Sequence, residues 1–184
     1  MTREITALLR AWAAGNTAAL NDALPAIYAE LCSIAAARLR ARRKGCTLDP
    51  SALVHEAYLR LAESSPAIFE SRSHFLAVAS LLMREILVDR FRAKKALKRG
   101  SNGVAVTLGE VPGGSGPEVD LLDLDAVLDE LAAAYQRHAK IVEMRFFGGL
   151  SVEETAGALG ISRATVKRDW MFARAWITER LGRR

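Results

Sequence analysis

Four polar side chains near the C-terminal end of the sequence are spaced for contact with a nucleic acid: Arg163, Thr165, Lys167 and Arg168. They follow Ser162, a favoured helix N-cap, so we expect them near the start of one helix and on its outward side. A guanidinium can donate two hydrogen bonds to O6 and N7 of guanine, and a lysine or threonine can bind a phosphate or a base edge. These residue types predict base reading in a DNA major groove.

The residues before Ser162 predict a second, shorter helix that braces the first. Ser151 and Glu154 have the spacing of a capping box. Ala156 is small enough to let the following helix cross closely, and Gly160 can adopt the positive φ that ends a helix before a tight turn. The apolar positions expected to face inward are Leu159, Ile161, Val166, Trp170 and Ala173. Together these features indicate a helix-turn-helix. The alternative is a solvated helical hairpin whose charges serve solubility alone.

The rest of the chain is predicted to form helices that position this motif. Apolar residues recur at intervals of three and four, which is helical periodicity, and no strand pattern competes strongly before residue 100. Asp49-Pro50 is typical of a capped helix start with a first-turn proline. We expect helices at about 2–15, 17–43, 50–61, 74–97, 120–131 and 136–147, with a loop at 64–73.

A glycine- and serine-containing segment divides the chain. Residues 100–117 surround a short VAVTL stretch and disfavour a packed helix. We therefore predict an all-α protein of two small helical domains, residues 1–99 and 120–184, joined by a flexible linker at 100–119. Because such a linker cannot offset its ordering entropy by apolar burial, we expect it to be mobile in the free protein.

Basic and acidic residues are segregated along the chain. The 26 Lys and Arg residues exceed the 21 Asp and Glu residues, and the net charge of +5 suits a polyanionic partner. Positions 72–99 hold eight basic and two acidic residues, whereas positions 118–130 hold six acidic residues and no basic one. This separation by sign predicts distinct surfaces for distinct partners.

Cysteine content and hydropathy exclude several classes of protein. Cys32 and Cys46 form no CxxC pair, and no histidine is spaced for a metal, so we expect no disulfide framework, zinc site or cofactor. The longest apolar run, 75–83, is too short to cross a bilayer, and the N-terminus lacks a signal-peptide core. We expect a cytoplasmic protein with no membrane partner.

With these residues in view, the sequence resembles the sigma-70 family of bacterial transcription-initiation factors. Residues 139–181, which include IVEMRFF (141–147) and GISRATVKRDW (160–170), resemble sigma region four. LVHEAYLRL (53–61) and REILVDRFR (84–92) look like sigma region two. Two such regions without further domains are the layout of the extracytoplasmic-function (ECF) subfamily.

The resemblance implies that the protein is not an enzyme and that its partners are core RNA polymerase and promoter DNA. Region two would bind the clamp helices of the largest polymerase subunit and open the minus-ten element. Region four would bind the flap of the second-largest subunit. It would read the minus-thirty-five element through Arg163, Thr165, Lys167 and Arg168. Residues implied for the minus-ten element are Phe69, Arg84, Arg92, Lys95 and Arg99.

Those five residues have a functional and a structural interpretation. The basic ones can hold backbone phosphates, and Phe69 in the loop can stack on a flipped base. The alternatives are a basic helix end that interacts with its own dipole and a phenylalanine that fills the core.

One position departs from the family's pattern. The family carries Asp-Ala-Glu-Asp before the Leu-Val of the clamp-binding helix, whereas this chain reads Asp49-Pro50-Ser51-Ala52. Phosphorylation of Ser51, or of Thr47, would restore the lost charge and make a Ser/Thr kinase a partner. The alternatives are a plain helix start, constitutive weak binding, and control by an anti-sigma protein. The residues implied for polymerase binding are Asp49, Ser51, Leu53, Val54 and Glu56.

Two other classes of protein could carry the same helix-turn-helix. A repressor or activator that is not a polymerase subunit would share the helix-turn-helix but need a ligand or dimerisation domain in the first hundred residues. A recombinase would need a nucleophile with converging Arg or His, and His55, His74 and His138 form no such constellation.

Overall fold

The computed structural model describes residues 2–16, 18–19, 22–23, 50–63, 71–97, 105–107 and 118–183. These residues are almost entirely helical, which confirms the predicted all-α class. The elements in chain order are α1 (Thr2–Ala13), α3 (Pro50–Glu63), α4 (Arg72–Leu97), β1 (Ala105–Thr107), β2 (Glu118–Asp120), α5 (Leu121–Ala134), α6 (Gln136–Val142), the π-helical turn η1 (Glu143–Phe147), α7 (Val152–Leu159) and α8 (Arg163–Leu181).

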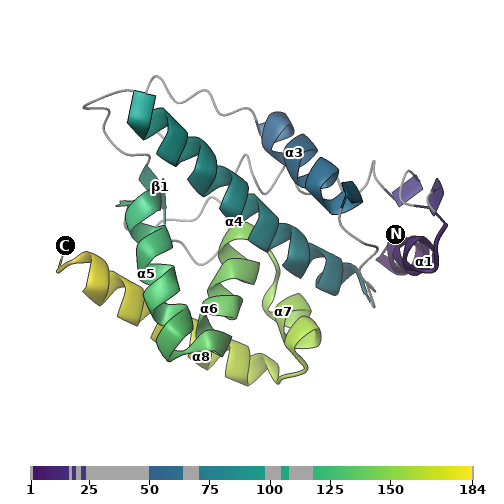
Figure 1. Ribbon diagram of the computed structural model, residues 1–184. Coiled ribbons are helices and arrows are strands. Elements are labelled where there is room, and N and C mark those ends of the chain that lie inside the picture. The colour runs from purple at the N-terminus through teal and green to yellow at the C-terminus, as the bar shows by residue number, and fades with distance from the viewer. Residues whose placement is uncertain are drawn as a thin grey trace.

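Helix α4 is the central element of the molecule. It is 26 residues long, and it contacts α1 and α3 from the first half of the chain and α5, η1 and α7 from the second half. Figure 1 shows α3 on one side of α4 and the helices α5 to α8 on the other. The two halves that flank the predicted linker therefore pack against each other.

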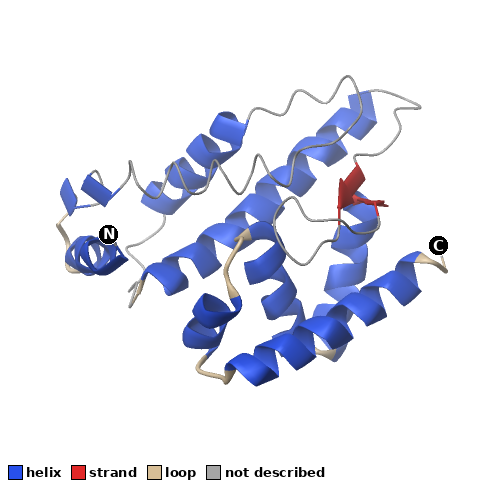
Figure 2. Ribbon diagram, turned by 180° about the vertical axis from the view of Figure 1, so that it is seen from behind, coloured by secondary structure: helices blue, strands red, loops and turns tan. Residues whose placement is uncertain are grey.

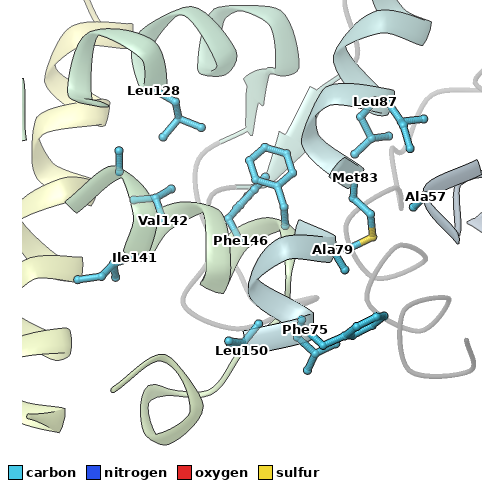
Figure 3. Packing of buried hydrophobic residues seen from close by; sticks show 14 of the residues in the cluster. Ala57, Phe75, Ala79, Met83, Leu87, Leu128, Ile141, Val142, Phe146 and Leu150 are labelled. Atoms are coloured by element: carbon cyan, nitrogen blue, oxygen red, sulfur yellow. The ribbon is translucent and has the colours of Figure 1, made fainter. Parts of the chain in front are cut away.

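The hydrophobic core is continuous through both halves. Phe75 and Met83 of α4 are buried in the same cluster as Phe146 of η1 and Leu150 after it (Figure 3). Helix α3 contributes Val54 and Ala57, while α5 and α6 bury a row of leucine, isoleucine and valine side chains. Such burial of apolar surface is the main force that holds helices together.

Helix boundaries agree with the sequence patterns to within a few residues. Helix α3 begins at Pro50 as predicted. Helix α4 begins at Arg72 rather than 74, because the Ser71 hydroxyl accepts a hydrogen bond from the backbone N–H of His74 at 3.1 Å and so caps an earlier start. The helix predicted at 17–43 lies mostly outside the described residues.

Two features were not predicted. The helix expected at 136–147 changes at Glu143 into the π-helical turn η1, in which Gly148 N–H bonds to the Glu143 carbonyl at 3.2 Å. The VAVTL stretch supplies β1, which pairs antiparallel with β2, with Val106 opposite Val119. The remainder of the predicted linker, and with it the predicted mobility, lies outside the described residues.

Candidate nucleic-acid interface

The predicted helix-turn-helix is formed by α7 and α8. The Ser151 hydroxyl accepts from Glu154 N–H at 3.1 Å, and the Glu154 carboxylate accepts from Ser151 N–H at 2.9 Å, which completes the capping box. Gly160 ends α7 with φ of 65°, the left-handed conformation that favours glycine. Ile161 is partly buried against the core. These contacts confirm the predicted start and end of the first helix.

Helix α8 begins as the sequence predicted. The Ser162 hydroxyl accepts from Thr165 N–H at 3.1 Å. Val166, Trp170 and Ala173 are buried, and they fix the rotation of α8 about its axis. Figure 2 shows α8 along the outer edge of the molecule, where its other face meets solvent.

The four predicted base-reading residues are not equivalent. The side chains of Arg163 and Arg168 are 70% and 74% exposed, and Lys167 is exposed as well. Thr165 is half-buried, and its hydroxyl lies 2.9 Å from that of Ser162. Three cationic side chains therefore project from the first turns of α8, and Thr165 supports the cap beneath them.

Arg84, one of the predicted minus-ten residues, is almost buried between the two halves, with its side chain 12% exposed. Its guanidinium donates to Asp125 Oδ1 at 2.9 Å, Asp129 Oδ1 at 2.6 Å and Glu143 Oε1 at 2.6 Å. A fourth bond reaches the Asp125 carbonyl at 3.1 Å. We call Asp125, Asp129 and Glu143 the acidic surface. In this arrangement the carboxylates of the acidic surface bind the guanidinium that the resemblance assigns to DNA.

Burial and charge shift the pKa of two members of this cluster, Glu143 and Arg84. Burial raises the pKa of Glu143 above its usual value, and the positive charge and hydrogen bond of Arg84 oppose this rise without cancelling it. For Arg84, burial acts to lower the pKa, but the hydrogen bond to Asp129 and the charge of Asp125 outweigh it and raise the pKa. The guanidinium therefore stays charged while Glu143 protonates more readily than a solvated glutamate.

The structure describes only some of the other predicted minus-ten residues. Arg92 is 62% exposed and lies 3.0 Å from Asp125 Oδ2, so it belongs to the same ion-pair cluster at its solvent side. Lys95 lies in α4, but its side chain is outside the description, as are Phe69 and Arg99 entirely.

The residues implied for polymerase binding lie on or before α3. Val54 is buried in the core, where it holds α3 against α4. Glu56 accepts from Arg90 at 2.5 Å and from Arg60 at 3.0 Å. Burial acts to raise the pKa of Glu56, but these two arginines lower it overall. Ser51 and Leu53 are in α3 without described side chains, and Asp49 and Thr47 are outside the described residues.

Sequence reasoning missed the acidic surface and a second ion pair between the halves, from Arg72 at the start of α4 to Glu154 of α7. The available signal was the segregation of charge, which we interpreted as two surfaces for two external partners. The structure instead brings part of the acidic segment 118–130 against the basic helix α4.

Other kinds of site find no support in the described part of the chain. There, no group of three or more histidine, cysteine or acidic side chains is arranged to hold a metal ion. None of the described helices is both long and apolar enough to span a membrane.

Comparison with known proteins agrees with the helix-turn-helix and the α3–α4 half. A search of the curated proteins found no match to the chain. The family model for ECF sigma factors matches residues 2–183. Members of this family act with RNA polymerase in promoter-specific transcription initiation, and they are initiation factors rather than catalysts. Since the match spans nearly the whole sequence, the chain belongs to the ECF sigma factor family.

Proposed function

We propose that this protein binds core RNA polymerase, directs it to specific promoters and assists the opening of the minus-ten element. The observation that carries the proposal is the set of three exposed cations at the start of α8, on a helix-turn-helix whose caps, turn and buried face are all in place. A recognition helix contacts base edges through its N-terminal residues. The α7–α8 unit would therefore read the minus-thirty-five element and bind the flap of the second-largest subunit.

The α3–α4 half would bind the clamp helices of the largest subunit and hold the minus-ten element. Arg84 and Arg92 are suited to phosphate because a guanidinium binds phosphate and carboxylate with the same two-pronged geometry. Both side chains already bind carboxylates: Arg84 binds three, and Arg92 binds Asp125. Each half offers a small basic footprint. Specific binding should therefore require polymerase to hold the two halves on one promoter.

Run-off transcription with purified core polymerase and a genomic DNA pool tests this function. Arg163→Ala or Lys167→Ala should lower transcription from the preferred promoters by a factor of about 5 to 150, which corresponds to about 1–3 kcal/mol for a lost base contact. Arg183→Ala is the matched control. Arg183 is 69% exposed, about as much as Arg163, and it lies beyond the far end of α8, where it pairs with Glu179 of that helix.

Two results would contradict the proposal. One is unchanged promoter choice in both α8 variants. The other is nanomolar binding of the isolated protein to one operator without polymerase, which would favour a repressor or activator.

For regulation, we propose that a phosphate on Ser51, or on Thr47, supplies the acidic charge that residues 49–52 lack. A phosphate adds about −1.5 to −2 charges and is favoured near a helix N-terminus such as that of α3. Ser51→Glu and Ser51→Glu/Ala52→Asp should bind core polymerase more tightly than Ser51→Ala. If the acidic variants bind no better and Ser51→Ala is fully active, regulation through Ser51 is excluded, and an anti-sigma protein becomes the partner to seek.

A further inference from the structure

A buried carboxylate lies in α8 directly after the last of the exposed cations. The side chain of Asp169 is 4% exposed, and Asp169 follows Arg168 in the sequence. His138 of α6 lies beside it, with Nε2 3.8 Å from Asp169 Oδ1, and the His138 ring packs against the rings of Phe172 and Tyr135. A carboxylate that is removed from water in this way needs a partner, because an unpaired buried charge is costly.

The partner of Asp169 comes from a second helix. Helix α6 packs against α8 (Figure 1), and Arg137, the second residue of α6, donates from Nε to Asp169 Oδ2 at 2.8 Å. The Arg137 side chain is nevertheless 51% exposed. Its two terminal nitrogens have no hydrogen-bond partner among the residues that the structure describes. Asp169 therefore takes one of the three guanidinium nitrogens of Arg137 and leaves the other two available.

Arg168 shares the same carboxylate. Its Nε lies 3.5 Å from Asp169 Oδ1, and its side chain is 74% exposed. Two guanidiniums from different helices thus converge on one carboxylate, although a single guanidinium would neutralise it. The positive charge that is left over lies at the surface of the molecule, where it attracts a polyanion.

The position of Arg137 beside α8 suits a phosphate rather than a base. An α-helix with its side chains is about 10–12 Å across, so it fills a major groove that is about 12 Å wide. Cations at the flank of such a helix therefore meet the sugar-phosphate backbone that borders the groove. Asp169 lies about 100° around α8 from Arg168, at the edge of the buried face, and it holds Arg137 at this flank.

We propose that Arg137, held by Asp169, binds a DNA phosphate at the edge of the major groove that α8 enters, beside the contact made by Arg168. Asp169 is then a positioning residue for two guanidiniums. The inference rests on the proposed function, since it takes α8 as the helix that enters the groove. A guanidinium that is already held by one hydrogen bond loses less conformational entropy when it binds, which favours the contact.

The test separates contact with DNA from neutralisation of Asp169. Arg137→Gln/Asp169→Asn removes the ion pair, keeps the net charge and leaves no buried charge unpaired. The matched control is Arg180→Gln/Glu130→Gln, which removes another half-exposed ion pair of the same half, at 3.3 Å and near the far end of α8. The readout is the affinity of the full-length protein with core polymerase for a promoter fragment, measured over a range of salt concentrations. Circular dichroism gives the Tm of each variant.

Loss of a phosphate contact has a signature that a structural ion pair lacks. Each phosphate contact contributes about 0.9 to the slope of log K against log salt concentration. Arg137→Gln/Asp169→Asn should therefore reduce that slope by about 0.9 and weaken binding by about two- to fivefold, the range for one exposed ion pair. The control should keep the wild-type affinity and slope. A wild-type slope in the Arg137 variant, or an equal change in the control, would overturn the proposal.

Arg137→Lys covers the case in which the double variant does not fold. The lysine keeps a cation for Asp169 but lacks the planar fork that binds two groups at once, so the slope should fall while the Tm stays near that of wild type. A folded Arg137→Lys protein with the wild-type slope would also refute the contact.

Run-off transcription by wild type with core polymerase separates this inference from the proposed function. An active wild type whose Arg137 variants keep its slope refutes the phosphate contact alone. An inactive wild type refutes the proposed function, and the slopes of the full-length proteins alone on the same duplex at low salt then decide the role of Arg137.

Discussion

Replacing Arg84 with methionine should show how much the ion pairs between Arg84 and the acidic surface contribute to stability. The substitution keeps the length of the side chain but removes its charge. Asp125 and Glu143, whose side chains are 8% and 10% exposed, would lose the guanidinium that binds both. Asp129, at 68% exposed, can turn to solvent. The cost therefore comes from two carboxylates rather than three.

The size of the effect follows from burial. Removing one partner of a buried ion pair costs about 3–5 kcal/mol because the remaining charge stays desolvated. We expect the lower end, about 3 kcal/mol, since separation of the halves would return both carboxylates to water and so limits the loss. At roughly 2–4 °C per kcal/mol for a chain of this length, Tm should fall by about 6–12 °C.

The loss should also depend on pH. The folded-state pKa of Glu143 is raised by burial, and Arg84 opposes that rise, so Arg84→Met should raise it further. A carboxyl with a raised folded-state pKa binds more protons when folded, so stability increases as pH falls through that pKa toward the usual value of 4.5. The difference in Tm between wild type and variant should therefore be smaller at pH 5 than at pH 7.5.

Arg92→Met is the matched control, on the same helix and with a partner in the same cluster. Because Arg92 is 62% exposed, its loss should cost less than about 1 kcal/mol. The assays are thermal unfolding by circular dichroism and hydrogen exchange across η1 and α4. If Arg84→Met and Arg92→Met matched each other in Tm and in interface protection, the reasoning about burial would be refuted.

Three further predictions concern the helix-turn-helix. Ser162→Ala should cost about 1 kcal/mol in urea unfolding, because Thr165 N–H loses its side-chain acceptor; no change would argue against the cap. Gly160→Ala should destabilise by about 1–2 kcal/mol because its φ is left-handed, whereas Gly157→Ala, mid-helix and equally open around the new Cβ, should stabilise by about 0.5–1 kcal/mol; the same sign for both would contradict the turn. The pKa of Glu154 is lowered overall, since hydrogen bonds from Ser151 and Arg72 outweigh the effect of burial, so its contribution is present above pH 4.5 and lost as pH falls through the lower folded value. Glu154→Gln should therefore flatten the dependence of Tm on pH between about 5 and 3, and an unchanged slope would exclude this carboxylate as its source.

The features that the sequence predicted correctly depend on interactions between residues that are close together in the chain. Ser151 and Glu154 are three positions apart, and the φ of Gly160 depends on its own missing Cβ, so local pattern was enough to place α7, the turn and the start of α8. The inward positions of α8 followed from helical period alone.

The features that the sequence did not predict depend on partners far along the chain. Arg84 bonds to residues 41, 45 and 59 positions away, and no pattern near Arg84 distinguishes those carboxylates from a phosphate. Gly148, at the end of the π-helical turn η1, also lies against a residue far along the chain, Ser80 of α4. Helical periodicity predicts that residues 143–147 are helical, but it does not predict the extra residue per turn of a π-helix.

Because its charges are segregated, such a sequence is compatible with two kinds of pairing, one with external partners and one within the chain. A basic helix and an acidic helix in one chain can bind external partners of opposite sign, or they can bind each other, and the donor and acceptor chemistry is the same in both cases. Tethering favours the internal pairing, because two segments of one chain meet at a high effective concentration. An external polyanion must therefore bind Arg84 and Arg92 better than the acidic surface does, with that advantage included.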